Sequence, residues 1–99
     1  MNFENSTVGG PIYHETLAVG VSRVKPGFGR QLARGVTIRA DDANAGIVFV
    51  GGPSVTDASG GSPGFPLPAG ESLFMAVNFP HDVHVVASVA AQKVALIGL

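Results

Sequence analysis

The chain has 99 residues, of which 45% are hydrophobic and only 13% are charged, and its formal net charge is −1. This length predicts one domain that buries roughly 60–65% of its unfolded surface on folding. The absence of cysteine excludes a disulfide framework, a thiolate nucleophile and a cysteine-ligated metal site. The low charge content indicates that part of the surface is covered by partners.

The N-terminal stretch, residues 1–11, is polar and glycine-rich, so we expect a flexible arm ahead of one domain over residues 12–99. This stretch lacks the basic start and apolar core of a signal peptide. No apolar run in the chain is long enough to cross a bilayer. We therefore expect synthesis in the cytoplasm and no membrane partner.

The first predicted strand covers residues 12–24, where Tyr13, Leu17 and Val19 share one face. Residues 25–30 contain a proline and two glycines and predict a turn.

The chain is organised around residues 35–77. Residues 36–40 alternate between apolar and polar and predict a half-buried strand. Residues 47–50 are apolar on both faces, so we expect a neighbouring layer or subunit to cover the side turned away from the core. The residues between these two strands, 41–46, are rich in Asp, Asn and Gly, and they predict a hairpin.

Residues 51–70 hold six glycines and four prolines, a composition that predicts a long surface loop without helix or sheet ladder. Phe65 and Leu67 stand among these prolines, and we expect them to anchor the end of the loop on the domain. A strand over residues 72–77 follows, with Leu73 and Met75 on one face and Phe74 on the other.

Two further strands are predicted over residues 83–87 and 93–99, and no stretch of the chain favours a helix. Strands at spacings of about ten residues are typical of all-β folds. We therefore expect a small antiparallel β-sandwich or barrel of about six to eight strands with a flexible N-terminal arm.

No motif in the chain names a reaction, and we do not expect an enzyme. His81 and His84 flank Asp82 as possible metal ligands, but in a strand the two histidines project to opposite faces, so we expect no metal and no cofactor. The serines lie in glycine-rich loops without a G-x-S-x-G elbow. Asp41 and Asp42 are better explained as turn formers.

Positive charge is concentrated between residues 23 and 39. Five basic residues there carry +5 with no acid between them, and the rest of the chain sums to −6. Two interpretations stay open: a patch that orients docking on an acidic surface, or solvated charges around a sheet edge. Nucleic acid is not an expected partner, because only Phe28 is interleaved among these residues and the pI is about 6.2. The five residues are Arg23, Lys25, Arg30, Arg34 and Arg39.

One family resemblance suggests a function. The chain contains five short motifs: VTIRA (36–40), NAG (44–46), VFVGG (48–52), PLPAGES (66–72) and VHV (83–85). In their order and spacing, these motifs resemble a pattern common in small virion structural proteins of tailed phages and prophages. The resemblance covers about residues 31–97.

The resemblance implies a capsid decoration (cement) protein that binds the outer capsid surface, bridges capsomers and stabilises the head. Its location would be the virion, and its partners would be the major capsid protein and further copies of itself in a homotrimer. The residues that we expect to contact partners are Phe3, Tyr13, Arg23, Phe28, Arg30, Arg34, Phe65 and Leu67.

Two alternatives remain. Another virion structural module, such as a head fibre, a neck or tail ring, or a receptor-binding tail tip, would share the fold; a tip would use exposed aromatics, for which Tyr13, Phe28 and Phe65 are the candidates. A metal-binding β-barrel of the cupin type would need several histidines and a carboxylate to converge.

Overall fold

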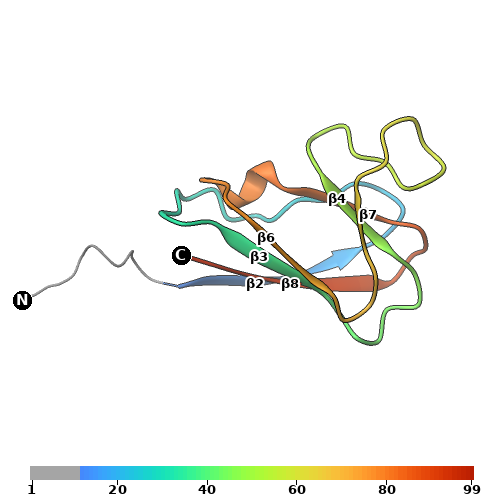
Figure 1. Ribbon diagram of the computed structural model, residues 1–99, viewed down its shortest axis with the longest axis horizontal. Coiled ribbons are helices and arrows are strands. Elements are labelled where there is room, and N and C mark those ends of the chain that lie inside the picture. The colour runs from blue at the N-terminus through green and yellow to red at the C-terminus, as the bar shows by residue number, and fades with distance from the viewer. Residues whose placement is uncertain (1–11) are drawn as a thin grey trace, which may run out of the picture.

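The computed structural model describes residues 12–99 and contains two antiparallel sheets that pack face to face (Figure 1). One sheet has four strands in the order β2-β8-β3-β6, and the other has three in the order β5-β4-β7. The predicted small antiparallel β-sandwich is confirmed. The predicted arm, residues 1–11, and the candidate contact Phe3 lie outside the described residues. The strands are β2 (Tyr13–Val19), β3 (Val36–Ala40), β4 (Val48–Gly51), β5 (Phe65–Leu67), β6 (Ser72–Met75), β7 (His84–Ala87) and β8 (Gln92–Gly98).

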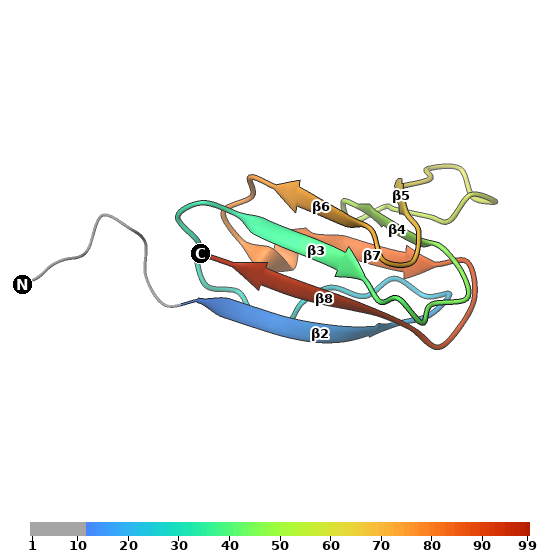
Figure 2. The same cartoon turned by 60° about the horizontal axis from the view of Figure 1, so that its bottom comes forward.

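Alternation of buried and exposed residues sets the inner face of the larger sheet. In β8 every second residue from Gln92 to Gly98 is buried and the others are exposed. β3 follows the same rule, with Val36, Ile38 and Ala40 buried. These side chains meet those of the smaller sheet in one apolar core, between the two sheets that Figure 2 shows. The alternation in the sequence therefore matches the alternation of buried and exposed residues in the fold.

β4 is buried on both faces, as its sequence predicts. Val48 and Val50 belong to the main core between the sheets. Phe49 points the other way and packs in a second cluster with Val55 and Val86. The predicted cover is therefore supplied by the chain's own loop, through Val55.

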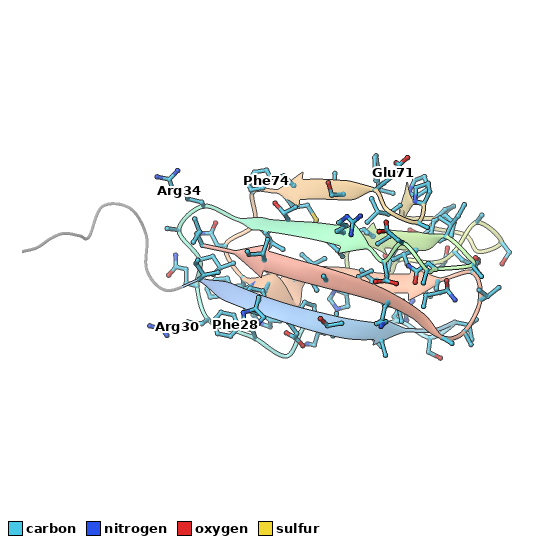
Figure 3. All side chains as sticks on the ribbon, turned by 90° about the horizontal axis from the view of Figure 1, so that it is seen from below. Phe28, Arg30, Arg34, Glu71 and Phe74 are labelled. Atoms are coloured by element: carbon cyan, nitrogen blue, oxygen red, sulfur yellow. The ribbon has the colours of Figure 1, made fainter. Side chains whose placement is uncertain are left out.

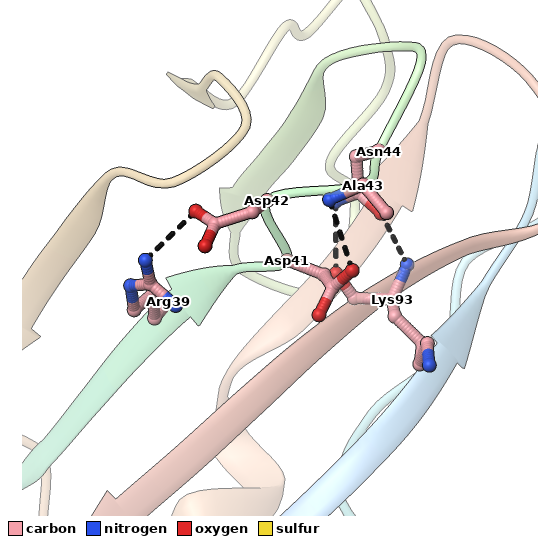
Figure 4. Close-up of polar contacts among 6 residues, drawn as sticks. All are labelled: Arg39, Asp41, Asp42, Ala43, Asn44 and Lys93. Carbon is pink, nitrogen blue, oxygen red and sulfur yellow. Dashed lines mark hydrogen bonds and ion pairs between the residues drawn. The ribbon is translucent and has the colours of Figure 1, made fainter.

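The predicted hairpin between residues 36–40 and 47–50 is wrong. β3 and β4 belong to different sheets, and the turn between them carries the chain across the sandwich. The turn formers do act as expected, because the Asp41 carboxylate accepts a hydrogen bond from the Ala43 N–H at 3.1 Å (Figure 4). β3 already has β8 and β6 as its two neighbours, so it offers β4 no free edge.

The predicted loop over residues 51–70 is also partly wrong, because it contains β5. β5 pairs with β4, with Leu67 opposite Val48 and Pro66 opposite Phe49. Pro66 is tolerated because β5 is an edge strand, where a proline N–H is not needed on the solvent side. The irregular parts of this stretch are thus residues 52–64 and the turn at residues 68–70.

The first strand is shorter than predicted. β2 ends at Val19, and residues 20–34 close one side of the sandwich. Val24 exchanges two backbone hydrogen bonds of 2.9 Å with Val85 of β7, and the Ala87 N–H donates to the Gly20 carbonyl oxygen at 2.8 Å. The helical content of the described residues is a single 3-10 turn, Pro80–Asp82. No helix within residues 12–99 is long and apolar enough to cross a membrane.

Candidate functional site

The two ends of the described chain meet at one end of the larger sheet, which we call the terminal end. The Arg34 and Gly35 N–H groups donate to the Leu99 carbonyl oxygen at 2.8 and 3.3 Å, and the Leu99 N–H donates to the Gly35 carbonyl oxygen at 3.2 Å. The last residue of the chain is thereby held against the start of β3. Ile12, the first described residue, lies at the same end, because the next residue, Tyr13, pairs with Gly98 and Ile12 lines one hollow with Leu99.

The outer face of the sheet is hollowed at the terminal end by an open groove of about 540 Å³. Most of its lining is apolar, with one cationic residue. We call it the outer groove; its lining residues are Ile12, Arg34, Gly35, Thr37, Phe74, Ile97, Gly98 and Leu99.

Strand register brings the groove residues together. Thr37 of β3 lies opposite Phe74 of β6 on one side and opposite Ile97 of β8 on the other, so the three form one row across the outer face. Phe74 is 59% exposed and Ile97 is 51% exposed. The solvent face of an antiparallel sheet is ordinarily polar, so a row with two large apolar side chains marks a candidate interaction surface.

Gly35 permits the close approach that shapes this groove. Its φ of +140° lies in a region that residues with side chains rarely adopt, and a Cβ there would clash with the Met75 carbonyl oxygen and lie 3.0 Å from the Phe74 ring. A glycine at this position therefore lets the start of β3 lie directly against β6.

A second hollow adjoins the first beneath the terminal end. Tyr13 stacks on Phe28 with ring centroids 4.5 Å apart and planes 15° apart. The Glu15 carboxylate accepts hydrogen bonds from the Tyr13 hydroxyl at 2.9 Å and from the Gly27 N–H at 3.3 Å. Burial, and next the hydrogen bond to Glu15, raise the pKa of Tyr13 above its usual range. These contacts hold the turn at residues 25–30 on β2.

Several of the predicted contact residues gather at the terminal end. Arg30 and Phe28 line the second hollow, and Arg34 lines the outer groove (Figure 3). Tyr13 is buried beneath them. Arg23 lies elsewhere, beside the irregular loop, where its guanidinium donates to the Val55 carbonyl oxygen at 3.4 Å.

The two predicted loop anchors behave differently. Leu67 is 1% exposed and belongs to the core, so it anchors the chain as expected but is not available for a partner. Phe65 is 56% exposed, so it is not an anchor, although it remains available as a surface contact. Alternation does not explain the difference, because residues two apart lie on the same face of a strand; Phe65 is the first residue of this three-residue edge strand and adjoins the irregular loop.

Four residues of the outer groove are not among the contacts predicted from the sequence: Phe74, Ile97, Ile12 and Leu99. The signal that could have found the first two is an apolar residue on the outward-facing side of an alternating strand. Nothing local marks Ile12 or Leu99, since only the fold brings the ends of the chain to this groove.

The five basic residues do not form one patch. Arg34 and Arg30 lie at the terminal end (Figure 3), whereas Arg39, toward the other end of β3, pairs with Asp42 at 2.8 Å (Figure 4). Within residues 12–99, no group of three His, Asp or Glu side chains is placed to hold a metal ion. His81 packs edge-on against Phe79, while the His84 ring contacts the Asp82 carbonyl oxygen at 3.2 Å.

Comparison with protein-family models, with curated proteins and with solved structures finds no match for this chain. A function for it has therefore to be inferred from the outer groove and from the sequence resemblance.

Proposed function

We propose that this protein is a capsid decoration protein that seats its outer groove on the major capsid protein. The observation that carries the proposal is the apolar groove on the solvent face of the larger sheet, lined by Ile12, Phe74, Ile97 and Leu99 among others. The resemblance of residues 31–97 to small virion proteins of tailed phages supplies the class of partner.

The physical basis of such a role is burial of surface at joints between capsomers. Apolar surface removed from water stabilises a contact by about 25 cal/mol per Å². A protein that binds only the assembled shell stabilises it by mass action, and the symmetry of the shell repeats each small contact many times. Arg30 and Arg34 at the rim would steer the groove toward an acidic surface.

The copy number of this chain per purified particle tests the role directly. Quantitative mass spectrometry against the major shell protein is expected to give a stoichiometry near that of the shell protein. A few copies per particle would instead favour the alternative, a head fibre, a neck or tail ring, or a receptor-binding tail tip. Absence from particles would overturn a virion role.

A matched pair of variants tests the groove itself. Ile97→Asp places a charge in the groove, and Ala95→Asp places the same charge on the same exposed face of β8, outside the lining. We expect Ile97→Asp to weaken co-sedimentation with capsids stripped of this protein by about tenfold or more, equal to about 1.4 kcal/mol, and Ala95→Asp to have little effect. Equal effects of the two variants would show that the outer groove is not the surface that binds the capsid.

A further inference from the structure

The sandwich has four sheet edges, formed by β2, β6, β5 and β7, and three of them are protected. β7 is covered by residues 20–24, which hydrogen-bond to it. β5 is only three residues long and contains Pro66. β2 carries Glu15 and has the turn at Gly27 against it. Short strands, prolines, charges and covering segments are the usual ways in which proteins block edge pairing.

β6 is also short, with four residues, but it lacks the other protections. Its sequence, SLFM, contains no proline and no charge. Among the described residues, no backbone hydrogen bond outside the pairing with β3 involves Ser72 or Phe74, and no other segment runs along its free side (Figure 2). An unprotected edge strand is a template for pairing with another chain.

The hydrogen-bond pattern shows which groups of β6 are free. Gly35 exchanges backbone hydrogen bonds with Leu99, and the Asp41 N–H donates to the Lys93 carbonyl oxygen. The backbone N–H and C=O groups of the odd-numbered residues of β3 therefore point toward β8. The backbone N–H and C=O groups of the even-numbered residues point toward β6, as the hydrogen bond of 2.9 Å from the Ala40 N–H to the Glu71 carbonyl oxygen confirms.

In the observed register, Val36 and Ile38 therefore bond to Met75 and Leu73. The N–H and C=O groups of the alternate residues of β6, Ser72 and Phe74, consequently point to the open edge.

We propose that β6 pairs antiparallel with β6 of a second copy about a two-fold axis at Phe74. In this register the free N–H and C=O of Phe74 bond to the same groups of Phe74 in the second copy, and Ser72 lies opposite Ala76. The pattern is self-complementary, as an isologous contact requires. The two Phe74 rings then lie side by side on the outer face, where cross-strand aromatic pairs are favourable.

Charge complementarity favours a second copy over an unrelated strand. Glu71 and Arg34 lie on opposite sides of Phe74 along this edge (Figure 3). The pairing of Val36 with Met75 and the hydrogen bond from the Leu32 N–H to the Asn78 carbonyl oxygen place Arg34 beside Ala76 and Val77. The two-fold axis places Glu71 of the second copy opposite Val77. Two strand spacings, about 10 Å, then separate the two backbones, a distance that Arg and Glu side chains span together. The two-fold symmetry gives two such pairs between Arg34 of one copy and Glu71 of the other.

The paired copies would form one continuous sheet with both outer grooves on the same side. If the proposed function holds, a consequence that rests on it is that each dimer presents two neighbouring grooves to the capsid. A contact through one four-residue strand is small, so we expect a dimer that dissociates on dilution.

Analytical ultracentrifugation of the full chain over a range of concentrations tests the pairing. We expect a monomer–dimer equilibrium. Glu71→Arg and Arg34→Glu should each weaken the dimer about tenfold, since each removes two surface ion pairs, and the double variant, which exchanges the charges, should restore it. Phe74→Pro removes an N–H that faces away from β3, so it should give a monomer with an unchanged circular dichroism spectrum. Ile97→Ser, on the same face, should leave the dimer intact.

Cross-linking tests the register. The chain has no cysteine, so Phe74→Cys introduces a single thiol, and Cα atoms about 5.5 Å apart across the axis suit a disulfide. Mild oxidation should link Phe74→Cys into a covalent dimer and leave Ile97→Cys without a disulfide cross-link.

A monomer at every concentration, a dimer insensitive to the charge variants and Phe74→Pro, or the homotrimer that the resemblance implies would overturn this inference. None of these results would change the copy number on particles, so failure here is distinct from failure of the decoration role.

Discussion

Asn44 and Lys93 are joined by hydrogen bonds in both directions, although they lie far apart in the chain. The Asn44 side-chain amide donates to the Lys93 carbonyl oxygen at 2.9 Å, and its carbonyl oxygen accepts from the Lys93 N–H at 2.9 Å (Figure 4). The side chain thus acts as a short strand partner for β8. It fastens the turn that carries the chain from one sheet to the other.

Asn44→Ala should lower the free energy of unfolding by about 1–3 kcal/mol, because it removes two hydrogen bonds and leaves the Lys93 N–H without its protein partner, while the Lys93 carbonyl oxygen keeps its bond from the Asp41 N–H. Urea denaturation followed by circular dichroism measures this loss. The matched control is Asp42→Ala in the same turn, which removes the exposed ion pair with Arg39 and should cost less than about 1 kcal/mol. Equal losses would show that the crossing turn is not held by Asn44.

Gly35→Ala should destabilise the fold by about 2 kcal/mol or more. An alanine there combines an unfavourable φ of +140° with a clash against the Met75 backbone. Thermal unfolding of this variant should be compared with that of Gly52→Ala, whose added Cβ meets nothing within 4 Å, and which should change stability by less than about 1 kcal/mol. A neutral Gly35→Ala would contradict the close approach of β3 to β6.

Val55→Ala should cost about 1–3 kcal/mol, because the side chain is buried against Phe49 and Val86 and its loss leaves a cavity. It should also speed limited proteolysis within residues 52–64, which this contact holds on the smaller sheet. Val89→Ala removes the same atoms from an exposed position and should leave both the stability and the cleavage rate unchanged. If the loop is cleaved at the same rate in both variants, Val55 is not what holds it.

Tyr13 should stay protonated in the folded protein at pH values where an ordinary tyrosine ionises. Its pKa is raised above the usual value of 10.0 by burial and by the Glu15 hydrogen bond. The stability that this shift represents is complete below pH 10.0 and is lost as pH rises toward the folded-state pKa, because the unfolded chain releases its proton first.

The ultraviolet absorbance of tyrosinate measures this titration without ambiguity, since the chain has one tyrosine. Protein unfolded in urea should titrate near the ordinary value and folded protein above it. If a sample that circular dichroism shows to be folded titrates at the ordinary value, the buried hydrogen bond between Tyr13 and Glu15 is ruled out. Glu15→Gln should lower the folded-state pKa toward the usual range.

Much of the local structure was predictable because it depends on neighbouring residues alone. The alternation in β3 and the placement of Phe74 on the opposite face from Leu73 and Met75 follow from the side-chain period of two, and the burial of β4 on both faces follows from its unbroken apolar run. The turn at residues 41–46 was predictable from its Asp and Asn residues, which bond to nearby backbone groups. The partner of β3 was not predictable, because backbone hydrogen bonds are alike in every pair of strands and do not identify the pair.

The candidate site depends both on the local sequence of each strand and on the tertiary structure. The sequence by itself determined that Phe74 would lie on the opposite face of its strand from Leu73 and Met75, and that no cysteine chemistry would be available. Only the tertiary structure decided that Phe74 and Ile97 would lie in one row with Thr37 on the outer face, and that Ile12 and Leu99 would join them at the terminal end. The physical reason is that strand order and register are set by how the whole core packs, a property that no single segment of the chain contains.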